Sequence, residues 1–273
     1  MKRPDMRIFD ALSGIVPKDA ILRDVSIGIF WTYVRTQYGS AISASAHRWC
    51  EDPPGAIIPR AGNLEGMPVS ALFSLYDSES LTARSLANAA VSASFPASQM
   101  TGQIFPGKAQ TLLETLCQAK PRHIALIGHF HFADELRAFG HQLDIYELDG
   151  RCEPGDRPSS QIPQYLPDAD IVVMTSSTMI THATEQILDS CRPDAFKMIV
   201  GPTVPLHPIL WDYGFDAVCG SIIHDDAQVS ATARQGGNHK QMTGAEKLNF
   251  IRPGTEFMRN AELFSNAQFA MRN

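Results

Sequence analysis

The stretch FKMIVGPTVPLHPILWDYGFDAVCGSIIHDDAQ, residues 196–228, decides the fold class. Its first apolar run, Lys197–Val200, predicts a strand that Gly201-Pro202 ends at once. Further prolines on both sides of His207 restrict the backbone of the loop that follows, so this loop is expected to be stiff.

The same stretch then repeats the pattern. Residues 208–213 favour a short helix, the apolar run 217–223 predicts a second strand, and Asp225-Asp226 provides an N-cap for another helix. Strands joined by helical crossovers are typical of a parallel sheet. Ligands of open α/β sheets bind at the carboxyl ends of the strands, so the loops after both runs are candidate binding loops.

Composition narrows the classes of partner. The chain has 273 residues, of which 44% are hydrophobic and 19% charged, as expected for one large or two medium globular domains. A net charge of -6 without a long basic run argues against nucleic acid. No apolar stretch approaches the roughly 18 residues of a membrane span, and the N-terminus lacks a signal-peptide pattern. We expect a cytoplasmic protein.

The cysteines are odd in number and widely spread, without a CxxC pair. We therefore expect free thiols in a reducing cytoplasm, rather than a disulfide framework or a cysteine metal site. The five are Cys50, Cys117, Cys152, Cys191 and Cys219.

Residues 1–97 are expected to form a smaller α+β domain. Alternating polar and apolar residues predict one strand over 24–36, and a turn leads to a second strand over 40–48. Helices are predicted over 6–16, 68–75 and 79–95. The last of these consists largely of small residues, so its neighbours can pack very close.

Residues 98–252 are expected to form an α/β domain with a doubly wound, Rossmann-like parallel sheet. A linker over 98–107 precedes it. Short apolar strands are predicted over 123–128, 144–148, 170–175, 197–200 and 217–223, with a final strand over 247–251; helices are predicted over 109–119, 132–139 and 182–191.

The end of the first of these strands lacks a dinucleotide fingerprint. Gly128 stands alone before His129, without GxGxxG, so no nicotinamide cofactor is supported. Glu147 and Asp149 close the second strand, where such folds often hold a ribose.

Several segments resemble the putative heavy-metal chelation family. They are IGHF at 127–130, YELD at 146–149, VGPTVPLHPILWDYGFDAVCGS at 200–221, and in the front half WTYVRT, AGNLEGMPV and LANAAVSA. The resemblance implies an enolase-N-terminal-like domain followed by a Rossmann-like domain, and a ligand or metal site in the cleft between them. Positions that match the family's motifs are Asn88, Gly128, His129, Glu147, Gly201, Pro202, Pro205, Gly220 and Asp225.

Four histidines follow predicted strands of the back domain. His129 and His131 follow the first strand, His207 the fourth and His224 the fifth, so all four belong to one edge of a parallel sheet. Imidazole suits zinc, copper, iron and nickel, which predicts a transition-metal site with Glu147 nearby. The alternative is that His129 and His224 cap helices or satisfy loop carbonyls, while the other two are solvated.

Other candidate ligand-binding groups lie in the same loops. Ser176 and Ser177 end the third strand and provide hydroxyls and amides for an anion at a helix start, or ordinary caps. The loop Gly201-Pro202-Thr203 is a second candidate anion site. Asp225 is either a cation ligand or a helix cap.

Three function classes follow from these residues. The first is a protein that binds a small ligand, a metal or a metal chelate in the interdomain cleft, which requires the front domain to cover the carboxyl edge of the back sheet. The second is an enzyme that acts on an amino-acid-derived or metal-chelating molecule, with His129 as acid or base. The third is an assembly protein without a ligand.

The C-terminal segment 253–273 carries a further prediction. Phe257, Phe264 and Met271 recur every seven residues, which predicts an amphipathic helix. We expect this tail to dock on its own chain or across the interface of a homodimer.

Overall fold

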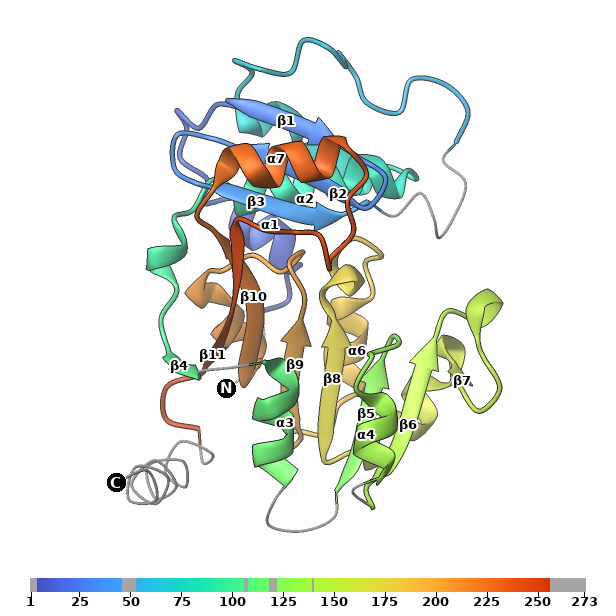
Figure 1. The fold of residues 1–273 in the computed structure, drawn as a ribbon. Helices are drawn as coiled ribbons and strands as arrows, with labels where there is room; N and C mark the ends of the chain where they lie inside the picture. Colours follow the sequence, from blue (N-terminus) through green and yellow to red (C-terminus); the bar gives the residue numbers. More distant parts are fainter. Residues whose placement is uncertain (1–3, 46–52, 106–107, 118–121, 139, 256–273) are drawn as a thin grey trace.

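The computed structural model describes residues 4–45, 53–105, 108–117, 122–138 and 140–255. It contains a small three-strand antiparallel sheet in the front part of the chain and a mixed, mostly parallel eight-strand sheet after it (Figure 1). This arrangement confirms the α/β class and the smaller α+β front unit.

The front sheet is a meander of β1 (Asp24–Ile27), β2 (Trp31–Arg35) and β3 (Ser40–Ala44). The single strand expected over 24–36 is therefore wrong. The chain reverses at Gly28, whose backbone N–H donates to the carbonyl of Trp31 at 2.9 Å. The alternation continues across this turn, which is why it resembles one long strand.

Three helices pack beside the front sheet: the last of them contacts β2 and β3, and the other two contact that helix. They are α1 (Ile8–Ser13), the 3₁₀ helix η2 (Val69–Asp77) and α2 (Leu81–Ser92). The Ser80 hydroxyl caps α2 by accepting from the backbone N–H of Ala83 at 3.1 Å. Small residues such as Ala89 and Ala90 are fully buried, so the expected close packing of this helix is confirmed.

Six strands of the back sheet are parallel. Their order is β10 (Ala217–Ile223), β9 (Phe196–Val200), β8 (Ile171–Thr175), β5 (His123–Ile127), β6 (Gln142–Glu147) and β7 (Arg157–Pro158). Antiparallel β11 (Ala245–Ile251) joins β10, and β4 (Gln103–Phe105) joins β11 at the edge. The expected linker over 98–107 thus contains a strand.

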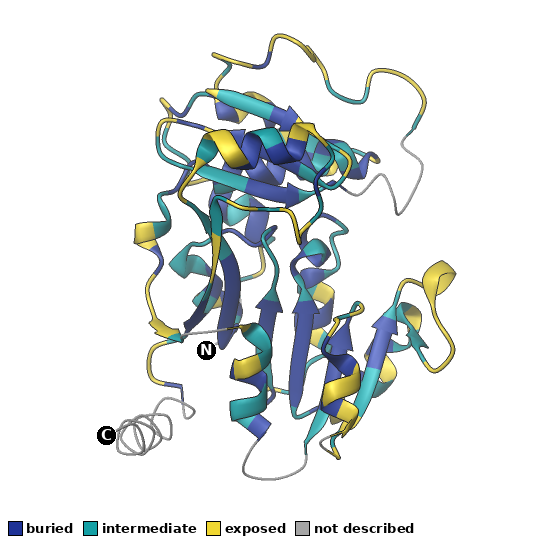
Figure 2. Ribbon diagram, in the orientation of Figure 1, coloured by how far each residue is buried: buried dark blue, intermediate teal, exposed yellow. Residues whose placement is uncertain are grey.

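Helices lie on both faces of this sheet. One face carries α3 (Ala109–Cys117) and α4 (Ala133–Ala138), and the other carries α5 (Ile162–Tyr165) and α6 (Thr184–Ser190) (Figure 1). Along β5, Ile124 and Leu126 pack in the core beneath α3 and α4. Ala125 and Ile127 point to the opposite face and pack in the core beneath α5 and α6. The central strands are buried on both faces, as Figure 2 shows.

The front unit lies over the carboxyl ends of the parallel strands (Figure 1), as a binding site in the interdomain cleft would require. The side-chain amide of Asn88, in α2, donates a 2.8 Å hydrogen bond to the carbonyl of Thr203, which lies in the loop after β9. The Thr203 hydroxyl accepts from the backbone N–H of Ala44, at the end of β3, at 3.0 Å. Both bonds join the units through buried groups.

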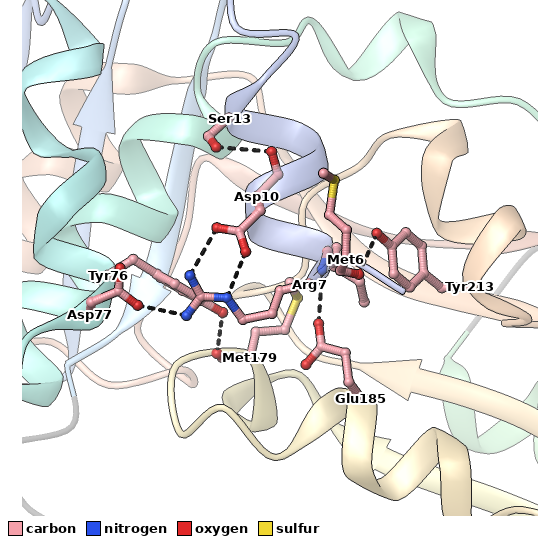
Figure 3. A network of polar contacts seen from close by, with 10 residues as sticks. Met6, Arg7, Asp10, Ser13, Tyr76, Asp77, Met179, Glu185 and Tyr213 are labelled. Carbon is pink, nitrogen blue, oxygen red and sulfur yellow. Dashed lines mark hydrogen bonds and ion pairs between the residues drawn. The ribbon is translucent and has the colours of Figure 1, made fainter. Parts of the chain in front are cut away.

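Figure 3 shows a second set of contacts between the two units, centred on Tyr76, which we call the seam. The Tyr76 hydroxyl donates to the carbonyl of Met179 at 2.5 Å, and its ring stacks on Phe9 with centroids 3.7 Å apart. Arg7 donates to Asp10 and to Asp77 beside it. These contacts tie α1 and η2 to the loop after β8.

Helix α7 (Asp226–Arg234) follows β10 but packs against β1 and β2 of the front sheet. Val229 and Ala233 share a buried cluster with Tyr33 of β2, and the Tyr33 hydroxyl donates to Asp226 at 2.9 Å. An element from the expected 98–252 domain therefore completes the front unit. The expected helical tail lies outside the described residues, except for its first three.

No helix in the described ranges is long and apolar enough to cross a membrane. Four of the five cysteines lie within those ranges and are free thiols. Burial raises the pKa of the Cys117 and Cys191 thiols to about 11, so both are protonated at neutral pH.

Candidate functional site

A cavity of about 630 Å³ opens at the carboxyl ends of β5, β6 and β8. Gly128 and His129 line it after β5, Glu147 and Asp149 after β6, and Ser177 after β8. All of its lining residues fall within 127–187, in the back unit. The cavity thus differs from the expected cleft between the two units, although the front unit lies over the same sheet edge.

Strand order explains why a cavity forms at this edge. From β5, the chain adds β6 and β7 on one side and β8, β9 and β10 on the other. The crossovers therefore leave a gap between β5 and β8, which is the topological switch point of the sheet. Gly128, with a φ of 94°, turns the chain away here, and a Cβ at this position would lie 3.1 Å from Thr175 Cγ2.

His129 lies between two carboxylates at this site. Its Nδ1 is 3.3 Å from Glu147 Oε2, and its Nε2 is 2.9 Å from Asp156 Oδ2. The Glu147 side chain is 11% exposed and that of Asp156 is 4% exposed, whereas the imidazole is 36% exposed. Two buried acceptors thus orient one accessible ring.

This geometry sets what the protein can offer a metal ion. Two donor atoms bound to one metal at about 2.0–2.2 Å are themselves about 3 Å apart, so His129 with either carboxylate fits a two-ligand pair. The two ring nitrogens point in different directions and cannot share one ion. Within the described residues, no group of three or more His, Cys, Asp or Glu side chains is arranged to hold a metal.

The other three predicted histidines do not line the cavity. His207 Nδ1 accepts from the backbone N–H of Ile209 at 3.2 Å, and thereby caps the 3₁₀ helix η8 (Pro208–Tyr213). Its ring lies 4.8 Å from that of Phe95, and burial lowers its pKa. His131 and His224 are exposed. The structure therefore brings only His129 of the four to this cavity.

Several predicted ligand-binding residues have structural roles around the loop after β9 instead. The Ser176 hydroxyl accepts from the backbone N–H of Thr203 at 3.2 Å. A Cβ on Gly201 would lie 2.3 Å from that hydroxyl oxygen, so this position requires glycine. These contacts hold the loop after β9 against the end of β8, and Thr203 of that loop accepts from Asn88 of the front unit. Pro202 in the same loop is half-buried.

Asp225 is the N-cap of α7 and accepts from the backbone N–H of Gln228 at 3.0 Å. This is the helix-capping alternative that the sequence left open. The neighbouring Asp226 accepts from Tyr33 and Ser40 of the front sheet. Both carboxylates thus have structural partners, and neither lines the cavity.

Sequence reasoning missed Asp156. It precedes β7, a two-residue strand that contains a proline, so no periodic pattern marks the segment. Asp149 was noted, and the structure adds its partners: it accepts from the Ser159 hydroxyl at 3.0 Å and the Ser160 backbone N–H at 3.2 Å. These bonds hold the pKa of Asp149 below its usual range.

Family models match both the front and the back unit of the chain. A model of the DUF364 family, described as "Putative heavy-metal chelation", matches residues 111–252. A model of the DUF4213 family, with the same description, matches residues 9–95. A comparison with curated proteins finds no match.

Two crystal structures of DUF364-family proteins of unknown function are similar to this chain. The protein from Desulfitobacterium hafniense is 20% identical, with a TM-score of 0.74. The protein from Pyrococcus horikoshii is 16% identical, with a TM-score of 0.75. Each match covers 90% of this chain and 98% of the other. At these identities the likeness shows a shared fold.

Proposed function

Since this chain belongs to the DUF364 family, described as "Putative heavy-metal chelation", we propose that it binds a transition-metal ion carried by a small organic chelator. The observation that carries this proposal is the accessible imidazole of His129, held between the carboxylates of Glu147 and Asp156 at the mouth of a cavity. Nitrogen and oxygen donors of this kind suit zinc, copper, iron and nickel.

The number of protein ligands favours a metal chelate over a bare ion. His129 and one carboxylate fill two coordination positions, whereas these metals take four or more ligands. The remaining donors would come from the chelator. A cavity of about 630 Å³ has the size of ordinary small-molecule sites, so it accommodates such a molecule.

An acid–base reaction on the bound molecule is a second candidate. Two carboxylates on opposite sides of an imidazole fix its orientation, and the ring of His129 is accessible at the cavity, which suits proton transfer to a bound molecule. Mass spectrometry of the chelator before and after incubation with the protein separates this reaction from simple binding, because only the reaction changes the chelator's mass.

The test is isothermal titration calorimetry of the full chain with nickel(II) and zinc(II). Each metal is supplied as the hydrated ion and as its one-to-one nitrilotriacetate complex. We expect the complexes to bind at one per chain and more tightly than the hydrated ions. His129→Ala should lower this affinity at least tenfold, because His129 is the one imidazole among the described residues that line the cavity.

The matched control is His224→Ala, which removes an exposed histidine away from the cavity. Unchanged binding in this variant supports the cavity site. Equal loss in both variants would favour the predicted site built from His129, His131, His207 and His224. If neither form of nickel or zinc binds, the proposal is wrong.

A further inference from the structure

We infer that the cavity takes a ribonucleoside without a 5′ diphosphate, with the Glu147 carboxylate accepting hydrogen bonds from the ribose hydroxyls. This inference deepens the proposed function, because it names the organic part of the bound molecule. It rests on that proposal only in using the same cavity. Metal binding is not needed for it.

The position of the cavity favours a nucleoside ligand. It lies at the switch point between β5 and β8, which is where open α/β sheets bind their ligands. The backbone N–H of Gly128 donates to the carbonyl of Tyr146 at 2.8 Å, so the ends of β5 and β6 lie side by side at the cavity floor. Glu147 is the next residue along β6 and ends that strand.

The carboxylate of Glu147 is suited to a vicinal diol. Its Oε1 accepts from the backbone N–H of Leu148 at 2.8 Å, and its Oε2 faces His129 at 3.3 Å. A carboxylate has about four acceptor sites, so each oxygen retains capacity for a hydroxyl donor. Because both oxygens are held and the side chain is only 11% exposed, the carboxylate is oriented before a ligand arrives.

The charge of the site argues against a pyrophosphate. Glu147 and Asp149 line the cavity, Asp156 lies behind His129, and Arg151 is the cationic side chain among the lining residues. Phosphate groups would meet repulsion here. The chain also has one glycine after β5 where a dinucleotide site has a glycine-rich turn. A neutral or cationic 5′ substituent fits better.

The remaining wall can receive the base. Ile127, Ile162 and Ile187 give the cavity an apolar side, on which a flat ring can pack. Tyr146 also lines the cavity, and its buried hydroxyl has no hydrogen-bond partner among the described residues.

The experiment uses calorimetry of the full chain in buffer with EDTA, so that no metal takes part. The probes are adenosine, guanosine, cytidine and uridine, their 2′-deoxy forms and their 5′-diphosphates. At least one ribonucleoside should bind at one per chain. Its 2′-deoxy form should bind at least tenfold more weakly, because one donor to Glu147 is lost, and its diphosphate should also bind more weakly.

Glu147→Gln should weaken the ribonucleoside at least tenfold and the 2′-deoxy form by a smaller factor, because the 2′-deoxy form has only its 3′-hydroxyl to donate to Glu147. Glu153→Gln is the matched control, because Glu153 is an exposed carboxylate nearby that does not line the cavity. Circular dichroism and the melting temperature report folding, and Glu147→Asp, which keeps the charge but shortens the reach, replaces the first variant if that one unfolds.

Three results would overturn the inference: no nucleoside binds, ribose and deoxyribose forms bind equally, or the Glu147 and Glu153 variants behave alike. Nickel-complex binding without nucleoside binding would reject this inference alone. Nucleoside binding in EDTA without any metal-complex binding would reject the proposed metal function alone.

Discussion

Gly28→Ala is expected to separate α7 from the front sheet. A Cβ at position 28 would lie 1.8 Å from the carbonyl oxygen of Ala233 and 2.8 Å from its carbonyl carbon. Both atoms are backbone, so no side-chain rotation relieves the clash. Restoring ordinary contact requires α7 or the β1–β2 turn to move by roughly 1.5 Å.

The cost follows from what this movement disturbs. Overpacking of this kind costs about 1–3 kcal/mol. The 3.1 Å hydrogen bond between the hydroxyls of Ser26 and Ser230, and the bond from Tyr33 to Asp226, would each lose about 0.5–1.5 kcal/mol. The sum is about 2–6 kcal/mol, a large share of the roughly 5–15 kcal/mol that stabilises a typical domain.

Urea unfolding followed by circular dichroism measures this loss. The matched control is Gly14→Ala. Gly14 has a helical φ of -64°, and the nearest atom to an added Cβ is 3.4 Å away, so alanine should be neutral or slightly stabilising there. If the free energy of unfolding of Gly28→Ala is within about 0.5 kcal/mol of the wild-type value, α7 does not lie in close contact with the β1–β2 turn.

Three further predictions address the seam and the tail. Tyr76→Phe should cost about 1–3 kcal/mol in urea unfolding, because the Met179 carbonyl loses its donor while the ring still stacks on Phe9; an unchanged midpoint would refute this. Burial lowers the pKa of His182 from 6.5, so its contribution to stability is fully present above pH 6.5 and is lost as the pH falls towards its folded pKa. His182→Asn, which tolerates the φ of 60°, should reduce this loss in unfolding titrations from pH 7.5 to 5, and an identical pH profile would contradict it. If the tail docks as predicted, truncation after Gly254 should lower the melting temperature or reduce the number of chains per particle measured by light scattering. If neither value changes, docking is rejected.

The strands of the back sheet were predictable because their sequence signal is local. Residues 217–223 form an apolar run bounded by turn residues, and β10 occupies that same range. The edge strands β4 and β7 were missed because they have three and two residues, which is too short for a pattern to appear. Their existence depends on a neighbouring strand that the local sequence does not reveal.

The candidate site was predictable only in part. Residues at strand ends were expected to meet, and Gly128, His129 and Glu147 do so because β5 and β6 are adjacent. The loop after β9 folds instead under the front unit, where Thr203 bonds to Asn88. Periodicity identifies the end of a strand, but it does not say on which neighbour the following loop packs.

The packing of α7 has a consequence for protein synthesis. The strands of the front sheet leave the ribosome early, whereas α7 follows only after almost the whole back sheet. Until then, the sheet face that contains Tyr33 and Ile42 lacks its cover. Domains usually fold in the order in which they emerge, but this front unit has to wait for a distant helix. A nascent or cleaved chain that stops before residue 226 therefore exposes an apolar face and calls for a chaperone.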